Sequence, residues 1–151
     1  SVMAEIDTIL NPKIPDDNGV AIFRVAGGAI VEVMGCFTAN VGENTTEVHG
    51  DKGTLIQNYG DAVSCQSPKT QRTPGLRWWM NGDSDWTDAG IDSPPNHLVR
   101  IQNVAVPAIE FFKGKRPPIA TAEEGRDVVE MLLAAYESSR TGKRIQFPYN
   151  P

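Results

Sequence analysis

The residues best suited to binding chemistry form one short run, Arg77-Trp78-Trp79. Tryptophan and arginine are enriched at protein interfaces, and an indole ring offers a flat face on which a sugar can stack. Since neighbouring side chains of a β-strand point to opposite faces, Trp78 and Trp79 are expected on different sides of a sheet. The run is therefore a candidate substrate-side platform or a candidate protein interface, and the sequence leaves both open.

A second group is a series of oxygen donors whose order superficially resembles a calcium-binding loop. It consists of Asn81, Asp83, Asp85, Asp88 and Asp92. The turn glycine of such a loop is replaced by Trp86, and the closing bidentate glutamate is replaced by Asp92. We therefore interpret the segment as a solvated acidic loop.

The run His49-Gly50-Asp51-Lys52 could serve as an acid–base cluster or could form the tip of a hairpin. The second interpretation is favoured because Asp-Lys-Gly is ordinary turn chemistry between two β-rich runs. Zinc is not expected, since the chain has two histidines and no Cys-x-x-Cys pair. No catalytic, cofactor-binding or metal-binding residue is assigned from the sequence.

A chain that binds a dinucleotide through its own Rossmann unit needs a glycine-rich turn between a strand and a helix. The sequence has no Gly-x-Gly-x-x-Gly motif, no Walker loop and no serine nucleophile elbow. Gly27-Gly28 joins two strand-like runs, and Gly50 to Gly53 closes a hairpin. Neither turn is therefore expected to bind a phosphate at a helix N-terminus.

The first two thirds of the chain alternate between apolar and polar residues, with turn residues in between, which predicts strands. The expected strands are Val2–Leu10, Val20–Val25, Ala29–Phe37, Thr46–His49, Thr54–Asn58, Ala62–Gln66 and Leu76–Met80, with a last one at Arg144–Phe147.

From Leu98 onward the hydrophobic period changes to that of a helix, with Pro107 expected to kink or break it and Gly114 to end it. A second helix should begin at Thr121, because Thr121 and Glu124 form a capping box, and should end at Gly142. Its large apolar residues recur on one side and predict a buried stripe. They are Val128, Val129, Leu132, Leu133 and Tyr136.

Strands grouped first and helices grouped last predict an α+β fold, with one domain over residues 1–151 and a mainly antiparallel sheet. If helices cover one sheet face, the other face is too apolar to stay fully wet. That face carries Ile30, Met34 and Cys36, or else their alternating neighbours, because the sequence does not assign the register. We therefore expect self-association through the open face.

The composition limits the class of partner. The net charge of −5 argues against a nucleic-acid or anionic-membrane surface, and no apolar stretch is long enough to cross a membrane. Cys36 and Cys65 are expected to be reduced and partly buried in a cytoplasmic protein, with a disulfide as the weaker alternative. The chain begins at Ser1, on strand-like residues and without an initiator methionine, so we expect it to be a piece of a longer protein.

The order of these segments resembles the C-terminal domain of the Gfo/Idh/MocA oxidoreductases, which include glucose–fructose oxidoreductase and inositol dehydrogenase. Asp17–Ile30 is similar to two strands of that domain and their glycine turn, and Val48–Leu55 is similar to its G-x-x-G-T/S-L hairpin. Ala122–Arg126 and Ser139–Lys143 resemble the two ends of its final helix. The resemblance covers nearly the whole chain and is weakest between Ala62 and Asn96.

The resemblance implies a parent enzyme that binds NAD or NADP on an N-terminal Rossmann domain and moves hydride to or from a sugar, polyol or similar small molecule. The family's catalytic residues precede the strand that corresponds to Val2–Leu10, so none carries over to this chain. The fragment is expected to be inactive and to bind no cofactor, while shaping the substrate cleft and a homo-oligomer interface. The alternative is a free-standing β-sheet module that dimerises or binds sugars without catalysis.

Overall fold

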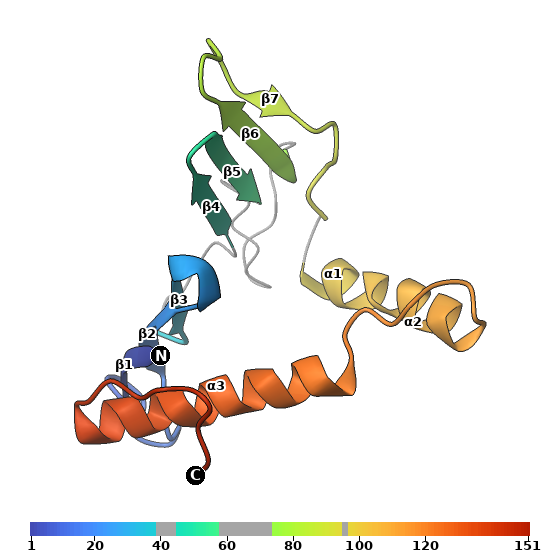
Figure 1. Ribbon diagram of the computed structural model, residues 1–151. Coiled ribbons are helices and arrows are strands. Elements are labelled where there is room, and N and C mark those ends of the chain that lie inside the picture. Colours follow the sequence, from blue (N-terminus) through green and yellow to red (C-terminus); the bar gives the residue numbers. More distant parts are fainter. Residues whose placement is uncertain (39–44, 58–73, 95–96) are drawn as a thin grey trace. The chain divides into compact units, whose positions relative to one another are not determined.

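The computed structural model describes residues 1–38, 45–57, 74–94 and 97–151 (Figure 1). The chain divides into two compact units: unit 1 is Ser1–Ala39 with Pro118–Pro151, and unit 2 is Asn40–Pro117. The expectation of a single domain over residues 1–151 stays a prediction.

Unit 1 contains an antiparallel sheet of three strands in the order β1 (Val2–Asp7), β2 (Asn18–Arg24) and β3 (Ile30–Cys36). β2 and β3 are joined by a tight 3-10 turn at Ala26–Gly28. Gly27 and Gly28 have φ angles of 83° and 87°, which side chains with a Cβ rarely adopt. The hairpin predicted at this glycine pair is confirmed.

The long helix α3 (Ala122–Thr141) has the ends that its sequence predicts. Thr121 Oγ1 accepts the Glu124 N–H at 3.2 Å, and the Glu124 carboxylate accepts the Thr121 N–H at 2.8 Å. Gly142 ends the helix in the left-handed region at φ 64°. Both helix ends therefore satisfy backbone groups that would otherwise lack partners.

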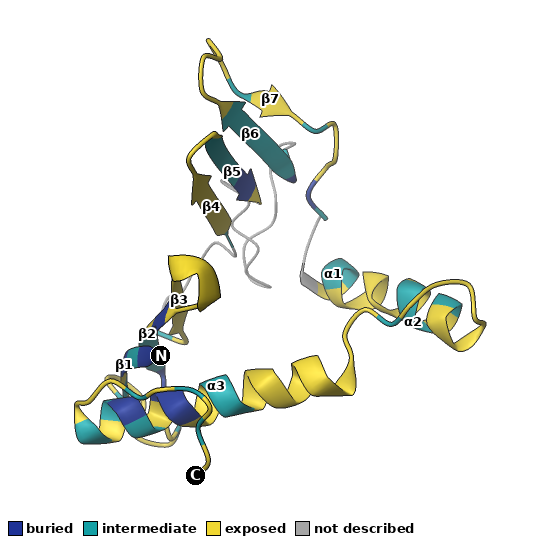
Figure 2. Cartoon of the chain, in the orientation of Figure 1, coloured by how far each residue is buried: buried dark blue, intermediate teal, exposed yellow. Residues whose placement is uncertain are grey.

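The core of unit 1 forms where α3 packs against β1 (Figure 2). Ala134 and Ala135 of α3 are buried in one cluster with apolar residues of β1 and β2. Ser138 Oγ accepts the Ala4 N–H at 3.1 Å, and Ser139 Oγ accepts the Ile6 N–H at 2.8 Å. The strand residues of the cluster are Val2, Ala4, Ala21 and Phe23.

The predicted buried stripe of α3 is wrong, because its five large apolar residues are between 40% and 64% exposed. The buried side of the helix consists of Ala134, Ala135 and Ser138 instead. Small side chains let the helix approach β1 closely enough for serine hydroxyls to bond strand N–H groups, which large side chains would prevent. The exposed stripe is Val128, Val129, Leu132, Leu133 and Tyr136.

Unit 2 contains a four-stranded antiparallel sheet whose strands follow the chain order. They are β4 (Thr46–Gly50), β5 (Gly53–Gln57), β6 (Leu76–Met80) and β7 (Thr87–Asp88). A two-residue turn at Asp51-Lys52 joins β4 and β5, as predicted. A Cβ at Gly53 would clash with the carbonyl oxygen of Trp79, so this position requires glycine. The strand predicted at 62–66 lies outside the described residues.

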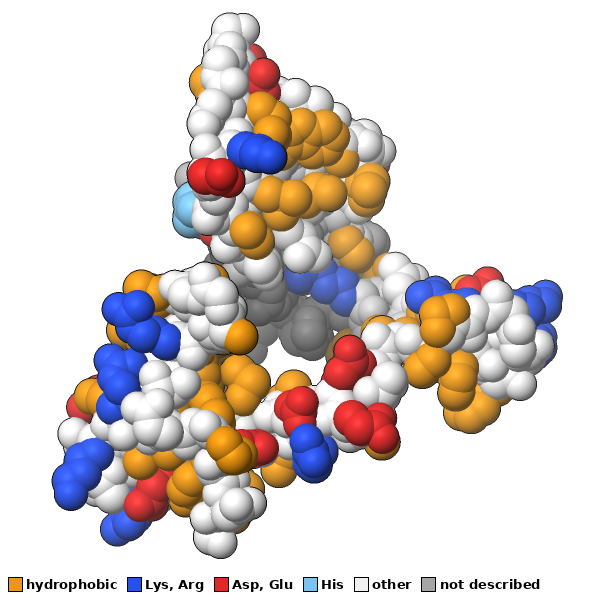
Figure 3. All heavy atoms as spheres, viewed as in Figure 1, with side chains coloured by type: hydrophobic (Ala, Val, Ile, Leu, Met, Phe, Trp, Pro, Cys, Tyr) orange, Lys and Arg blue, Asp and Glu red, His pale blue; other side chains and the backbone are white. Residues whose placement is uncertain are grey.

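Two short helices, α1 (His97–Asn103) and α2 (Ala105–Phe112), replace the single run predicted from Leu98 to Phe112. The break lies at Val104, three residues before Pro107, and the Pro107 ring would collide with the carbonyl of Asn103 in a continuous helix. The predicted break is therefore confirmed. α2 exposes Val106, Ile109 and Phe112, and Figure 3 shows hydrophobic side chains gathered at the surface of this pair of helices.

The α+β class with antiparallel sheets is confirmed, with the described strands distributed over two sheets. The last predicted strand, 144–147, is reduced to a single bridge between Ile145 and Val2. In the part of the chain that the structure describes, no helix is long and apolar enough to cross a membrane.

Candidate functional site

The predicted binding run lies on β6, where Arg77 and Trp79 share one face and Trp78 lies on the other. Trp86 packs against both residues of the first face. The Arg77 guanidinium lies 4.6 Å from the centroid of the Trp86 ring, and the rings of Trp79 and Trp86 meet edge to face at 5.9 Å. All three side chains are half-buried. The structure therefore joins Arg77 and Trp79 into one cluster through a residue expected only as part of a loop.

The register between β6 and β7 explains why Trp86 lies beside Trp79. β6 and β7 pair with Trp78 opposite Thr87, and one step further toward the turn this register brings Trp86 opposite Trp79. A two-residue hairpin turn at Asn81-Gly82, which this dipeptide favours, would instead place Ser84 opposite Trp79, so the sequence gives no signal for the position of Trp86. Trp78 lies across from Leu55 on the opposite face, beside the exposed Val48 and Met80. Whether either face meets a substrate or a protein stays a prediction.

Acidic residues that follow β6 accept hydrogen bonds from backbone N–H groups. Asp83 Oδ2 accepts the Met80 N–H at 2.9 Å, and Asp85 Oδ1 accepts the Trp86 N–H at 2.7 Å. Asp88 Oδ1 accepts the Gly90 N–H at 2.8 Å. Among the described residues, no three His, Cys, Asp or Glu side chains lie close enough together to hold a metal ion. The carboxylates thus shape the turn.

His49 lies at the predicted hairpin tip and is exposed. Its Nδ1 is 3.2 Å from Thr54 Oγ1 on the neighbouring strand, and its Nε2 is 3.3 Å from a carboxylate oxygen of Glu47. Asp51 contributes its backbone carbonyl, which accepts a hydrogen bond from the Asn81 side chain. The hairpin-tip interpretation is confirmed by this geometry.

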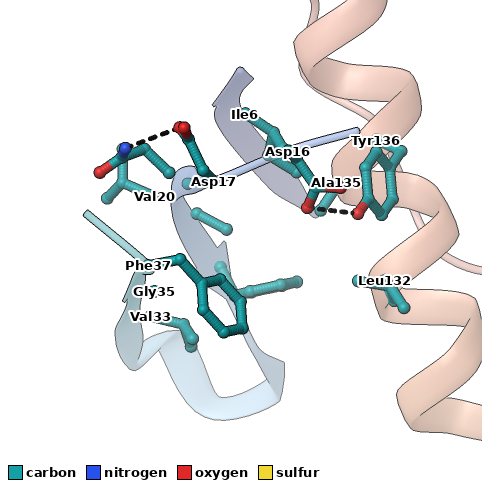
Figure 4. A pocket seen from close by; sticks show the side chains of 14 residues that line it. Ile6, Asp16, Asp17, Val20, Val33, Gly35, Phe37, Leu132, Ala135 and Tyr136 are labelled. Atoms are coloured by element: carbon teal, nitrogen blue, oxygen red, sulfur yellow. Dashed lines mark hydrogen bonds between the residues drawn. The ribbon is translucent and has the colours of Figure 1, made fainter. Parts of the chain in front are cut away.

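A hollow of unit 1 lies between β2, β3 and α3 (Figure 4) and has a volume of about 230 Å³. Gly19, Ala21 and Gly35 leave space on the sheet, since they carry little or no side chain. Phe37 and Leu132 are two of the larger apolar residues that line it. The hollow suits an apolar group.

The polar rim of this hollow is made by two neighbouring aspartates. Asp16 Oδ2 accepts the Tyr136 hydroxyl at 2.7 Å, and this hydrogen bond raises the pKa of Tyr136. Asp17 is buried and accepts three consecutive backbone N–H groups, at 2.7 to 2.8 Å. These bonds, from Ile9, Leu10 and Asn11, hold the pKa of Asp17 well below its usual range. Asp17 therefore organises the loop after β1.

The sheet register assigns the open face that the sequence left undecided. Val31 and Val33 pair with Phe23 and Ala21, so they lie on the same side as the core. Ile30 and Met34 lie on the opposite side and are 60% and 75% exposed. Cys36 is also exposed, which corrects the expectation of a partly buried thiol, and Cys65 lies outside the described residues.

Comparison with known proteins finds the same fold in solved oxidoreductases. The WlbA dehydrogenase of Bordetella pertussis, in complex with NADH and UDP-GlcNAcA, is 24% identical over 99% of this chain, with a TM-score of 0.60. The aldose-aldose oxidoreductase of Caulobacter crescentus, complexed with glycerol, is 20% identical over 97%, with a TM-score of 0.63. A putative oxidoreductase of Klebsiella pneumoniae is 16% identical over 99%, with a TM-score of 0.64.

This chain covers only 39%, 40% and 44% of those three proteins, respectively. No curated protein sequence matches it. Residues 1–56 match the model of the GFO/IDH/MocA C-terminal domain. The resemblance to the C-terminal domain of the Gfo/Idh/MocA oxidoreductases is thus confirmed, by the family match over residues 1–56 and by the fold over nearly the whole chain.

Proposed function

We propose that this chain is the C-terminal part of an NAD(P)-dependent oxidoreductase that acts on a sugar, a polyol or a related small molecule. The observation that carries the proposal is the shared fold with a dehydrogenase bound to NADH and UDP-GlcNAcA and with an aldose-aldose oxidoreductase. The chain spans less than half of either protein. The family match at residues 1–56 supports the same assignment.

In this proposal the nicotinamide is bound by an upstream Rossmann domain, and the present chain supplies part of the substrate cleft. The described residues support this division. The turn at Gly27-Gly28 connects two strands, and the Asp51-Lys52 turn closes a hairpin, so neither presents a helix N-terminus to a phosphate. By itself the 151-residue chain is expected to catalyse no hydride transfer.

We also propose that the chain self-associates through the open face of the β1–β3 sheet. Ile22, Ile30 and Met34 are exposed there, and such a patch favours burial against a second copy. Met34→Glu should reduce the mass measured by light scattering, whereas Glu123→Gln, at an exposed position on α3, should leave it unchanged. A monomer in the unmodified chain would refute this part of the proposal.

The enzymatic part is tested with the protein extended to the upstream start of its reading frame. The extended protein should oxidise aldoses, polyols or nucleotide sugars with NAD or NADP, measured by absorbance of the reduced nicotinamide. The 151-residue chain is the matched control and should be inactive. A start codon immediately before Ser1, or turnover by the short chain, would contradict the proposal and favour a free-standing module.

A further inference from the structure

The chain contains two Asn-Gly pairs, Asn18-Gly19 and Asn81-Gly82, in very different surroundings. In an Asn-Gly pair the backbone nitrogen of the glycine can attack the asparagine side-chain carbon, because glycine has no side chain to obstruct the approach. The two pairs have the same intrinsic chemistry. The fold therefore decides how fast each one reacts.

Asn81-Gly82 lies in the exposed turn that follows β6. Gly82 has a φ of 99°, and a Cβ built on it would meet no atom within 4 Å, so its backbone is open to approach. The Asn81 side chain has one hydrogen bond, from Nδ2 to the Asp51 carbonyl at 2.7 Å. Asn81 as a whole is exposed.

Asn18-Gly19 lies in β2, the central strand of its sheet. Gly19 pairs with Ile6 on one side and Gly35 on the other, and a Cβ on it would lie 3.3 Å from the Ile6 side chain. Asn18 Nδ2 donates to Asp17 Oδ1 at 2.9 Å, and Asn18 also contacts Thr38 Oγ1. Reaction at this pair requires the sheet to open locally, which costs free energy.

We propose that Asn81-Gly82 is a site of spontaneous deamidation and that the fold protects Asn18-Gly19. In the first step the Gly82 nitrogen bonds to Cγ of Asn81, the Cγ–Nδ2 bond breaks, and the leaving nitrogen departs as ammonia with the Gly82 amide proton. Water then opens the succinimide at either carbonyl, which gives aspartate or isoaspartate. No oxidant or reductant takes part.

The modification removes a structural contact as well as an amide. Asn81 holds the β4–β5 turn through its side-chain bond to the Asp51 carbonyl and through its backbone N–H to the Lys52 carbonyl at 2.9 Å. A carboxylate at position 81 would face that carbonyl with no proton to donate, and isoaspartate would lengthen the turn. Deamidation should therefore loosen the corner where β4, β5 and β6 meet.

The test is incubation of the folded 151-residue chain at mildly alkaline pH, followed by tryptic digestion and mass spectrometry. Asn18 and Asn81 fall in different tryptic peptides, 14–24 and 78–100. Deamidation at Asn81 should be at least about tenfold faster than at Asn18, because Asn18 can react only when the sheet around it opens locally. Equal rates, or a faster reaction at Asn18, would overturn the proposal.

A denatured sample and two variants separate fold from sequence. In concentrated denaturant the rates of the two pairs should converge, and a persistent difference would show that sequence context controls them. Asn81→Gln keeps the amide and should stop the modification, whereas Asn81→Asp should reproduce the faster hydrogen exchange of aged protein in β4 and β5. Unchanged exchange in Asn81→Asp would refute the structural consequence.

Discussion

Unit 1 and unit 2 are each stabilised internally by a different kind of contact. In unit 1 the first strand and the last helix meet through alanines and serines, and a hydrogen bond joins residues 134 positions apart. In unit 2 a short sheet carries a cluster of half-buried large side chains, Arg77, Trp79 and Trp86. Closely packed small residues cannot be replaced by larger ones without moving the backbone. In a half-exposed aromatic cluster, by contrast, one side chain can be removed and its neighbours can rearrange. The two units should therefore respond very differently to substitution.

The largest expected effect is that of Ala134→Leu, because Ala134 is fully buried between α3 and the sheet. The added carbons should separate α3 from β1 and lower the free energy of unfolding by about 3 kcal/mol, measured by urea denaturation. Leu132→Ala, on the exposed stripe of the same helix, is the control and should cost about 0.5 kcal/mol or less. A large loss for Leu132→Ala would show that the stripe is buried after all.

Asp17→Asn should remove part of the acid sensitivity of unit 1. The folded-state pKa of Asp17 is lowered below its ordinary value of 3.8 by three backbone N–H bonds. Its contribution to stability is therefore complete above that ordinary value and is lost as the pH falls toward the folded-state pKa. Asp17→Asn should be less stable at neutral pH, with a flatter decline in acid. An unchanged acid profile in thermal melts would refute this role.

Ser138→Ala should give a smaller loss, again confined to the contact between α3 and β1. Ser138 Oγ accepts the Ala4 N–H and donates to the Lys143 carbonyl at 2.7 Å, so the variant leaves both groups without a partner. The expected cost is about 2 kcal/mol. Ser84→Ala, at an exposed position in unit 2, is the control. Equal stability of the two variants would contradict the importance of this bond.

The smallest expected effect is that of Trp86→Ala. The variant loses the stacking with Arg77 and the edge contact with Trp79, together worth about 1 kcal/mol at a half-exposed site. Hydrogen exchange should increase in β6 and β7 and stay unchanged in α3. Faster exchange throughout unit 1 would show that the two units do not respond separately.

The same contrast explains which features could be predicted from the sequence. Local signals sufficed where backbone geometry decides the outcome: the turn at Gly27-Gly28, the capping box of Thr121 and the break before Pro107. The buried side of α3 could not be read this way. Amphipathicity alone selects the large apolar residues, but close contact with β1 favours Ala134, Ala135 and Ser138.

The candidate site was predicted in part for a similar reason. Arg77, Trp78 and Trp79 could be identified by residue type, and their alternation across β6 follows from strand geometry. Trp86 was missed because its position depends on the register between β6 and a β7 only two residues long. The hydrogen bonds to Asp17 form because the loop after β1 folds back on itself, for example between Leu10 and Asp17, seven residues apart. Hydrophobic periodicity does not predict such a contact.

The central claim is that this chain is the substrate-side part of a nicotinamide-dependent enzyme and that its cofactor is bound upstream. Calorimetric titration with NADH and NADPH of the 151-residue chain and of the upstream-extended protein tests it most directly. The extended protein should bind one of the two nucleotides with a measurable heat, and the short chain should bind neither. Binding by the short chain, or binding by neither protein, would contradict the claim.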